Sequence, residues 1–379
     1  MARVPRLVAL FGALVFVSII TTSPVAADTA AGIAYLRPTQ QANGGWDANP
    51  AFEFATTEAL LAIAEQAQTG AGWSTAQAFA AVDGFDHPNP PNNDPLSFAD
   101  DMADGAIPPS LAGKLIVMVA APLGLSTTDF DPKNDTVAAV NLETALDPAG
   151  CAGNVASFGF FGETLMAMLA KRLVCGAVPL AATANVRGAQ QADGAWNFTG
   201  LPAPAGFDDF DTTAAAIQAL IAAGAAPTDV DVVEGLAFLA TKQSASGAWE
   251  AFDAASPEST SRAILAITAA GYDPGSSCWR DTVAPSLQGT AYGSPITALA
   301  NLQNANGSWG TFGPDFSTGQ AVQGLERQWL PVTRAPTQTC VLAAPPATAP
   351  AQEGVGGAAP PSVAGGTAVP VVANPNFTG

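Results

Sequence analysis

The sequence has few basic residues, with 13 Lys and Arg against 32 Asp and Glu and a formal net charge of −19. Such an acidic excess repels phosphate backbones, which argues against nucleic acid as a partner. There is one histidine, His87, and none of the four cysteines has the CxxC spacing of a zinc site. We therefore expect neither a metal nor another cofactor.

Several common catalytic motifs are also missing. The sequence contains no Gly-x-Ser-x-Gly, no Gly-rich phosphate loop and no His-Glu-x-x-His. No segment has the roughly 20 apolar residues that a membrane span needs. The apolar run at residues 7–20 is shorter, follows Arg3 and Arg6, and precedes small residues at 25–27, which is typical of a secretory signal. We predict a signal peptide at residues 1–27, cleavage near Ala27 and a secreted or extracytoplasmic protein with no membrane span in the mature chain.

The cysteines are even in number, which in an exported chain indicates disulfide bonds. Four cysteines allow three connectivities. We favour pairing of nearest neighbours in the sequence, Cys151 with Cys175 and Cys278 with Cys340.

A seven-residue pattern, Gln-x-Ala-[Asn/Asp/Ser]-Gly-x-Trp, occurs four times in the chain. The Gln always precedes the Trp by six residues. Such recurrence indicates a repeat protein. The glutamines are Gln40, Gln190, Gln243 and Gln303, and the tryptophans are Trp46, Trp196, Trp249 and Trp309.

Each copy of the pattern lies between two stretches with helical character. The second stretch begins with a hydroxyl, continues with Ala, Leu and Ile at helical spacing and usually ends at a Gly. Strand signals are nearly absent. We predict an all-α fold, an α/α toroid of six helical hairpins over residues 28–334, in which the second helices form an inner ring and the first helices an outer one. The hydroxyls, expected as N-caps or first-turn residues, are Thr57, Ser110, Thr164, Thr213, Thr260 and Thr318, and the first helices are expected at 29–40, 74–82, 134–146, 180–190, 229–243 and 295–303.

Two regions depart from the repeat. Residues 85–101, rich in Pro and Asn, replace the pattern in the second repeat. Residues 335–379 consist mainly of Pro, Ala, Gly, Val and Thr with one charge, Glu353, so we predict a disordered tail.

The repeats resemble the Gln-Trp repeats of squalene-hopene cyclases and the related prenyltransferase β-subunits, over about 300 residues. That resemblance implies the toroid fold and leaves the activity open, because one architecture hosts many chemistries. It also implies that the Gln amide caps a helix end and that the indole stacks on it. A carbohydrate-stacking role for the four tryptophans is the alternative.

The resemblance suggests one catalytic candidate. Class II cyclases of this family protonate an alkene with an Asp in the motif Asp-x-Asp-Asp-Thr-Ala. Residues 209–214 read Asp-Phe-Asp-Thr-Thr-Ala, with Thr where the last Asp should stand. By resemblance, Asp211 would be the proton donor and Asp209 its helper, and Asp208 could supply the missing charge. Such an enzyme would be an isomerase of the terpene cyclase type.

Helix capping is the competing explanation. Asp211 or Thr212 could simply cap the fourth inner helix, and Glu258 occupies the position of Asp211 in the next repeat. The inner helices also carry few of the aromatic side chains that stabilise a carbocation. Both considerations weigh against a cyclase.

Acidic and aromatic residues recur where the chain enters the inner helices, so they should cluster at one end of the toroid. An acidic rim over an aromatic floor could bind a sugar, a cation or a hydrophobic guest, and paired carboxylates hydrolyse glycosides. Alternatively, the acids favour helix N-termini and the phenylalanines staple the loops. The candidates for binding at this cavity mouth are Glu258, Phe54, Phe161, Phe210 and Phe316, beside Glu53, Glu250, Asp253 and Asp315.

These observations favour an exported toroid that binds a small apolar molecule or a cell-surface partner in its central cavity, without catalysis. The alternative is an enzyme, either a divergent class II terpene cyclase with Asp211 as general acid or a carbohydrate lyase or hydrolase.

Overall fold

The structure is a computed structural model. By its internal contacts the chain divides into residues 1–342 and 343–379. All described residues belong to the first unit. The predicted signal peptide, the predicted tail, Glu53, Asp208 and Cys340 lie outside the described residues, as does the side chain of Phe54. The structure describes residues 28–47, 54–69, 72–85, 93–134, 138–153, 160–202, 209–251, 253–310, 313–328 and 330–331.

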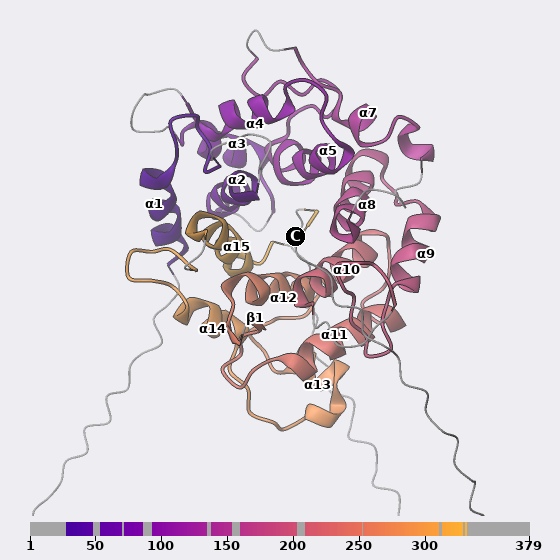
Figure 1. The fold of residues 1–379 in the computed structure, drawn as a ribbon. Coiled ribbons are helices and arrows are strands. Elements are labelled where there is room, and N and C mark those ends of the chain that lie inside the picture. Colours follow the sequence, from indigo (N-terminus) through magenta and orange to yellow (C-terminus); the bar gives the residue numbers. More distant parts are fainter. Residues whose placement is uncertain are drawn as a thin grey trace, which may run out of the picture. The chain divides into compact units, whose positions relative to one another are not determined.

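Six helical segments contact one another in chain order, and the last contacts the first, so that they close a ring (Figure 1). We call these segments the inner ring. The prediction of a mainly helical protein is confirmed, and each segment begins close to its predicted hydroxyl. The inner ring comprises α2 (Phe54–Gln66), α5 (Pro109–Leu115) continued by the π-helix η1 (Ile116–Ala120) and α6 (Ala121–Leu123), α8 (Phe161–Cys175), α10 (Phe210–Ala222), α12 (Pro257–Ala269) and α15 (Pro314–Glu326).

A second set of helices packs on the inner ring from outside, each against one or two inner helices. A short antiparallel pair of strands, in which Glu250 faces Ala255, leads into α12. Among the described residues, no helix has the length and apolar character of a membrane span. The outer helices are α1 (Thr29–Thr39), α3 (Thr75–Asp83), α7 (Leu142–Leu146), α9 (Leu180–Gly188), α11 (Val230–Lys242) and α14 (Pro295–Asn301), and the connecting elements are α4 (Pro95–Ala103), η2 (Gly150–Ala152), β1 (Glu250–Ala251), β2 (Ala254–Ala255), α13 (Cys278–Val283) and η3 (Pro285–Leu287).

Helix α4 was not anticipated, because it lies in the Pro- and Asn-rich stretch. Asp94 caps it by accepting the Ser97 N–H, and Pro95 occupies its first turn, where no N–H is needed. Leu96, Phe98 and Met102 are buried. The proline therefore starts a helix here instead of extending a loop.

The Gln-Trp loops join the two rings through a repeated set of hydrogen bonds. In the fourth repeat, the Trp196 indole N–H donates to the Val186 carbonyl near the end of α9, 2.6 Å away. Its backbone N–H donates to Thr213 Oγ1 at 3.0 Å, and Gln190 Nε2 donates to the Gly194 carbonyl at 3.0 Å. The same bonds recur around Trp46, Trp249 and Trp309, with Thr56, Thr260 and Thr318 as the hydroxyls and Gln40, Gln243 and Gln303 as the amides.

Two details differ from the sequence analysis. The indole, and not the Gln amide, reaches the last carbonyls of the outer helix. The repeated threonines hold the loop and do not cap the inner helix, since the N-cap of α10 is Asp209, which accepts the Thr212 N–H. In the first repeat the anchoring hydroxyl belongs to Thr56, one residue before the predicted Thr57.

The last repeat joins the first through the same kind of contact. Gln303 Nε2 donates to the Asp28 carbonyl at 2.9 Å, and Thr29 Oγ1 donates to Glu326 Oε1 at 2.9 Å. Gly307 lies so close to α1 that an added Cβ would be 2.5 Å from the Ala31 carbonyl oxygen. These contacts close the ring at the two ends of the repeat array.

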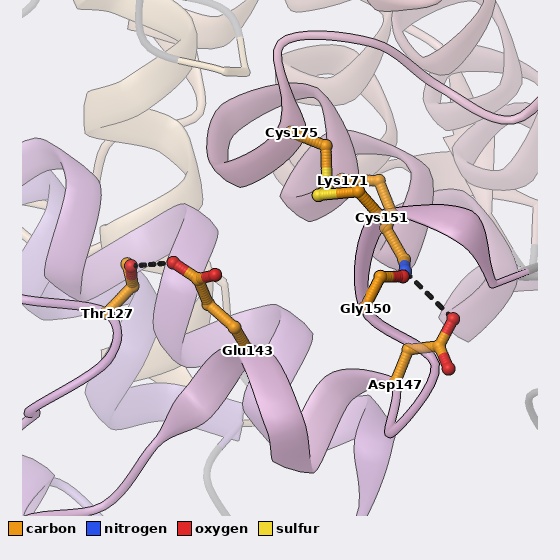
Figure 2. The surroundings of a disulfide bond; sticks show 7 residues. All are labelled: Thr127, Glu143, Asp147, Gly150, Cys151, Lys171 and Cys175. Carbon is orange, nitrogen blue, oxygen red and sulfur yellow. Dashed lines mark hydrogen bonds and ion pairs between the residues drawn. A yellow bond between two sulfur atoms is a disulfide. The ribbon is translucent and has the colours of Figure 1, made fainter.

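A disulfide bond joins Cys151 to Cys175 at the end of α8, which confirms the first predicted pairing (Figure 2). One helical turn before Cys175, Lys171 is buried, and its Nζ donates to Asp147 Oδ2 at 2.8 Å and to the Gly150 carbonyl. The bond and the ion pair hold the same loop on α8. The predicted partner of Cys278, Cys340, lies outside the described residues, so that pairing stays a prediction.

Candidate functional site

The repeated threonines define which side of α2, α10, α12 and α15 faces the interior of the ring. Thr213 ties one side of α10 to the outer layer, and positions two residues before and after it are rotated by about 160°, to the opposite side. The same rule applies to Thr56, Thr260 and Thr318. The positions two residues before these threonines form a first interior layer, which consists of Asp211, Glu258 and Phe316, with Phe54 at the matching backbone position of α2. The positions two residues after them form a second interior layer, which consists of Glu58, Ala215, Arg262 and Gln320.

The second interior layer contains a buried ion pair between α2 and α12. Arg262 Nη2 donates to Glu58 Oε1 at 2.6 Å. Two amides of α15 complete the shell of the carboxylate, because Gln320 Nε2 donates to Oε1 at 3.2 Å and Gln323 Nε2 to Oε2 at 2.7 Å. Burial alone would raise the pKa of Glu58, but the charges of Arg262 and Lys114 and the two amides outweigh burial and lower it. Glu58 is therefore ionised.

Asp211 is the notable acid of the first interior layer. Its side chain is accessible to solvent, yet burial among surrounding protein raises its pKa. A hydrogen bond from Ser259 and the charge of Arg262 oppose that rise, and the carboxylates of Asp209 and Glu258 add to it. Asp211 and Ala215, which lies one turn further along the same side of α10, are both accessible to solvent, and we call the space beside these two residues the recess.

Glu258 stands beside Asp211 in the same layer and is held by serines. The Ser256 hydroxyl donates to Oε2 at 2.9 Å, and the Ser317 hydroxyl donates to Oε1. These contacts tie the start of α12 to α15. The carboxylate is thereby fixed in position at the end of the ring where the inner helices begin.

The predicted aromatic residues do not gather in one place. The ring of Phe161 lies against Gly200 in the loop before α10, where an added Cβ would be 2.5 Å from Cδ2. Phe210 stacks at 5.9 Å between ring centroids on Phe238 of the outer helix α11. Phe316 is half-buried. Phe161 and Phe210 therefore contribute to packing around the inner ring, as in the stapling alternative.

The remaining predicted acids have separate surroundings. Asp209 caps α10, and Glu250 and Asp253 belong to the hairpin of β1 and β2. Asp315, whose pKa burial raises, contacts Thr39 and Tyr35 at the end of α1. No group of three or more His, Cys, Asp or Glu in the described ranges is arranged to hold a metal ion.

The polar residues of the second interior layer were not predicted from the sequence. Glu58 and Arg262 each stand two residues after an anchoring threonine, inside alanine-rich helices where charge is rare. A charged side chain in such a helix is costly to bury unless it is paired. Both residues could have been predicted as interior residues, because they lie two positions after a repeated threonine and therefore on the opposite side of the helix.

No protein-family profile and no curated protein sequence matches the chain. Among solved structures, the chain is similar to the apo type II terpene cyclase MstE from Scytonema, with 14% identity, a TM-score of 0.50, and coverage of 79% of this chain and 96% of that one. A variant of MstE in complex with its substrate geranylgeranyl dihydroxybenzoate gives 13% identity, a TM-score of 0.49, and coverage of 79% and 95%. A crystal structure of a protein from Actinoplanes gives 16% identity, a TM-score of 0.46, and coverage of 79% and 98%. The likeness to apo MstE confirms the predicted terpenoid cyclase-like fold.

Proposed function

We propose that this protein binds a small, largely apolar molecule in the centre of the inner ring and does not transform it. The observation that carries the proposal is the recess, where Asp211 and Ala215 on the interior side of α10 are accessible to solvent. The recess combines the carboxyl group of Asp211 with the apolar side chain of Ala215. Small-molecule sites commonly combine apolar walls with a few fixed polar groups.

The chemistry of the interior layers argues for binding over cyclisation. A carbocation requires aromatic faces for stabilisation. Here Phe210 packs on the outer helix α11 and Phe161 on Gly200, so that Phe316 is the described aromatic residue of the two interior layers. The second interior layer carries the carboxylate of Glu58 and the amide of Gln320, and the amide of Gln323 lies beside them. These nucleophilic groups would add to a carbocation and so stop the cyclisation.

The test of binding uses the prenyl alcohol geraniol and the full chain. Calorimetric titration should show saturable binding of one geraniol, and native mass spectrometry should show the complex. Ala215→Trp places an indole in the recess and should abolish binding. Ala30→Trp, at an exposed position of α1, is the matched control and should bind as the wild type does. If folded Ala215→Trp still binds geraniol, the ligand binds away from the centre of the ring.

A second candidate function is supported by the same acid. Burial raises the pKa of Asp211, and Asp209 and Glu258 add to the rise, so the carboxyl group keeps the proton that a general acid must donate. If the protein is a class II cyclase, incubation with squalene or geranylgeranyl dihydroxybenzoate yields a cyclic product. Asp211→Asn would then abolish turnover, and Glu234→Gln, at an exposed position of α11, would leave it unchanged. Absence of turnover in the wild type would reject this candidate.

The predicted export of the protein belongs to the proposal. Cleavage near Ala27 would leave Asp28 as the first residue, and Asp28 caps α1 by accepting the Ala31 N–H at 2.9 Å. N-terminal sequencing of the protein secreted by its native host should therefore begin at Asp28. Intact residues 1–27 on the mature protein would contradict export by signal cleavage.

A further inference from the structure

The chain itself enters the ring after its last inner helix. Helix α15 ends at Glu326, and Arg327 adopts a left-handed conformation with φ of 58°. Such a residue reverses the direction of the chain at a helix end. In Figure 1 the yellow segment that follows α15 accordingly runs toward the middle of the ring.

Leu330 is fixed inside the ring by a side chain of α10. Its backbone N–H donates to Gln218 Oε1 at 3.1 Å, and its side chain is 2% exposed. Gln218 lies seven residues after Asp211 on the same helix, so it shares the interior side of α10 two turns deeper. Pro331 is also buried. We call Gln328, Leu330 and Pro331 the plug.

Accessibility along the interior changes at the level of the plug. Asp211, Ala215 and Arg262 are at least partly accessible. One turn deeper, Gln218, Leu265 and Gln323 are buried, and their exposed fractions are 2%, 1% and 1%. On α10 the exposure of the interior side thus falls between Ala215 and Gln218, where Leu330 is held, whereas Glu58 and Gln320 of the second interior layer are already buried.

Polar groups without a partner are buried in the plug and on α2. Gln328 Nε2 has no hydrogen-bond acceptor, and the two carboxylate oxygens of Glu65 have no donor. Glu65 is 0% exposed and lies seven residues after Glu58 on the interior side of α2. Buried polar groups without partners are costly.

We infer that the plug limits the length of the ligand, so that the site accepts molecules of about ten carbons and rejects long polyprenyl chains. This inference rests on the proposed function and names its ligand class. The distance along α10 from Asp211 to Gln218 is seven residues, or about 10 Å at the helical rise. A twenty-carbon chain cannot lie extended in that depth without displacing Leu330.

The test compares two prenyl alcohols with the same head group, geraniol with ten carbons and geranylgeraniol with twenty. The wild-type chain should bind geraniol at least about tenfold more tightly. Leu330→Ala should reduce that preference to threefold or less, because it removes the side chain at the floor. Gln218→Ala, which removes the acceptor that holds the segment, should act in the same direction.

Leu142→Ala is the matched control, since Leu142 is equally buried but belongs to the outer helix α7. It should leave the preference unchanged. Equal affinity of the wild type for the two alcohols would overturn the length limit alone, as would an unchanged preference in folded Leu330→Ala and Gln218→Ala. Failure of the wild type and of both variants to bind either alcohol would instead overturn the proposed function.

Discussion

Arg262 donates to Glu58 at 2.6 Å, although 204 residues separate them in the sequence. The pair links α12 to α2, and the two amides from α15 surround the carboxylate between them. One buried carboxylate thus draws donors from two other inner helices. Its environment depends on closure of the ring.

Removal of one partner of this pair should be strongly destabilising. Arg262→Met leaves the buried carboxylate of Glu58 without its counter-charge, and we expect a loss of about 3–5 kcal/mol in the free energy of unfolding. Glu58→Gln strands the guanidinium and should cost a comparable amount. The double variant should cost clearly less than the sum, because neither charge is then left alone. Urea denaturation measures all three.

A less buried ion pair provides the control for that experiment. Arg187 contacts Asp229 at 2.7 Å between outer helices, and the two side chains are 33% and 23% exposed. Exposed pairs contribute about 0–1 kcal/mol. If Arg262→Met were no more costly than Arg187→Met, the central pair would not hold the ring together.

Glu65 should make stability depend on pH. Its pKa lies well above the ordinary 4.5 because of burial, with repulsion from Glu326 and Glu58 adding to the rise and Arg262 opposing it. The folded state therefore holds this proton more tightly than the unfolded state. Stability is fully present below the ordinary pKa of 4.5 and falls as pH rises from there through the raised pKa.

Glu65→Gln removes the titrating carboxyl group, so the variant should lack the fall in stability that ionisation of Glu65 causes. The variant should gain stability over the wild type progressively as pH rises above 4.5. Urea denaturation at a series of pH values above 4.5 provides the measurement. Glu234→Gln, an exposed change on α11, should follow the wild-type curve. Parallel curves for wild type and Glu65→Gln would show that Glu65 ionises without cost.

The ring could be predicted from the sequence because the same residue types make the same contacts in each Gln-Trp loop. Each Trp binds a carbonyl of the outer helix and a Thr of the inner one, so the spacing from Gln to Trp to hydroxyl marks both helices. Helix α4 escaped prediction because Pro95 and the surrounding asparagines resemble a loop. Its start depends on Asp94, whose capping role is evident only with the structure.

The interior was harder to predict than the ring. Phe210 and Asp211 are neighbours in the sequence, but one residue rotates a helix by about 100°. Phe210 consequently packs on Phe238, whereas Asp211 faces the recess. The plug could not be predicted at all, because the turn at Arg327 occurs at a residue with no intrinsic preference for a left-handed conformation.

Gly194 should tolerate alanine much less well than another left-handed glycine. Both Gly194 and Gly224 have positive φ, 90° and 96°. An added Cβ at Gly194 would be 2.3 Å from the Glu234 carbonyl oxygen, whereas at Gly224 it meets nothing within 4 Å. Gly224→Ala should cost only the conformational strain, about 1–2 kcal/mol.

Gly194→Ala should cost clearly more than Gly224→Ala, because the loop must also move away from α11. Thermal or urea unfolding of the two variants measures the difference. A similar loss for both would mean that the loop can shift without disturbing the next hairpin.

Removal of the Cys151–Cys175 bond should destabilise the protein by about 3 kcal/mol, as expected when a bond that closes a loop of this length is lost. The sequence separation is 24 residues. Cys151→Ser with Cys175→Ser should therefore lower the urea midpoint. The ion pair of Lys171 and Asp147 would still hold the loop, so the fold itself should persist.

The same measurement tests the predicted second bond. Cys278 and Cys340 are 62 residues apart, and a bond between them would contribute about 4 kcal/mol on the same chain-entropy argument. Reductant added to Cys151→Ser with Cys175→Ser should then lower the midpoint further. If reductant leaves that double variant unchanged, Cys278 and Cys340 do not form a stabilising bond, and residues beyond α15 are not tied to α13.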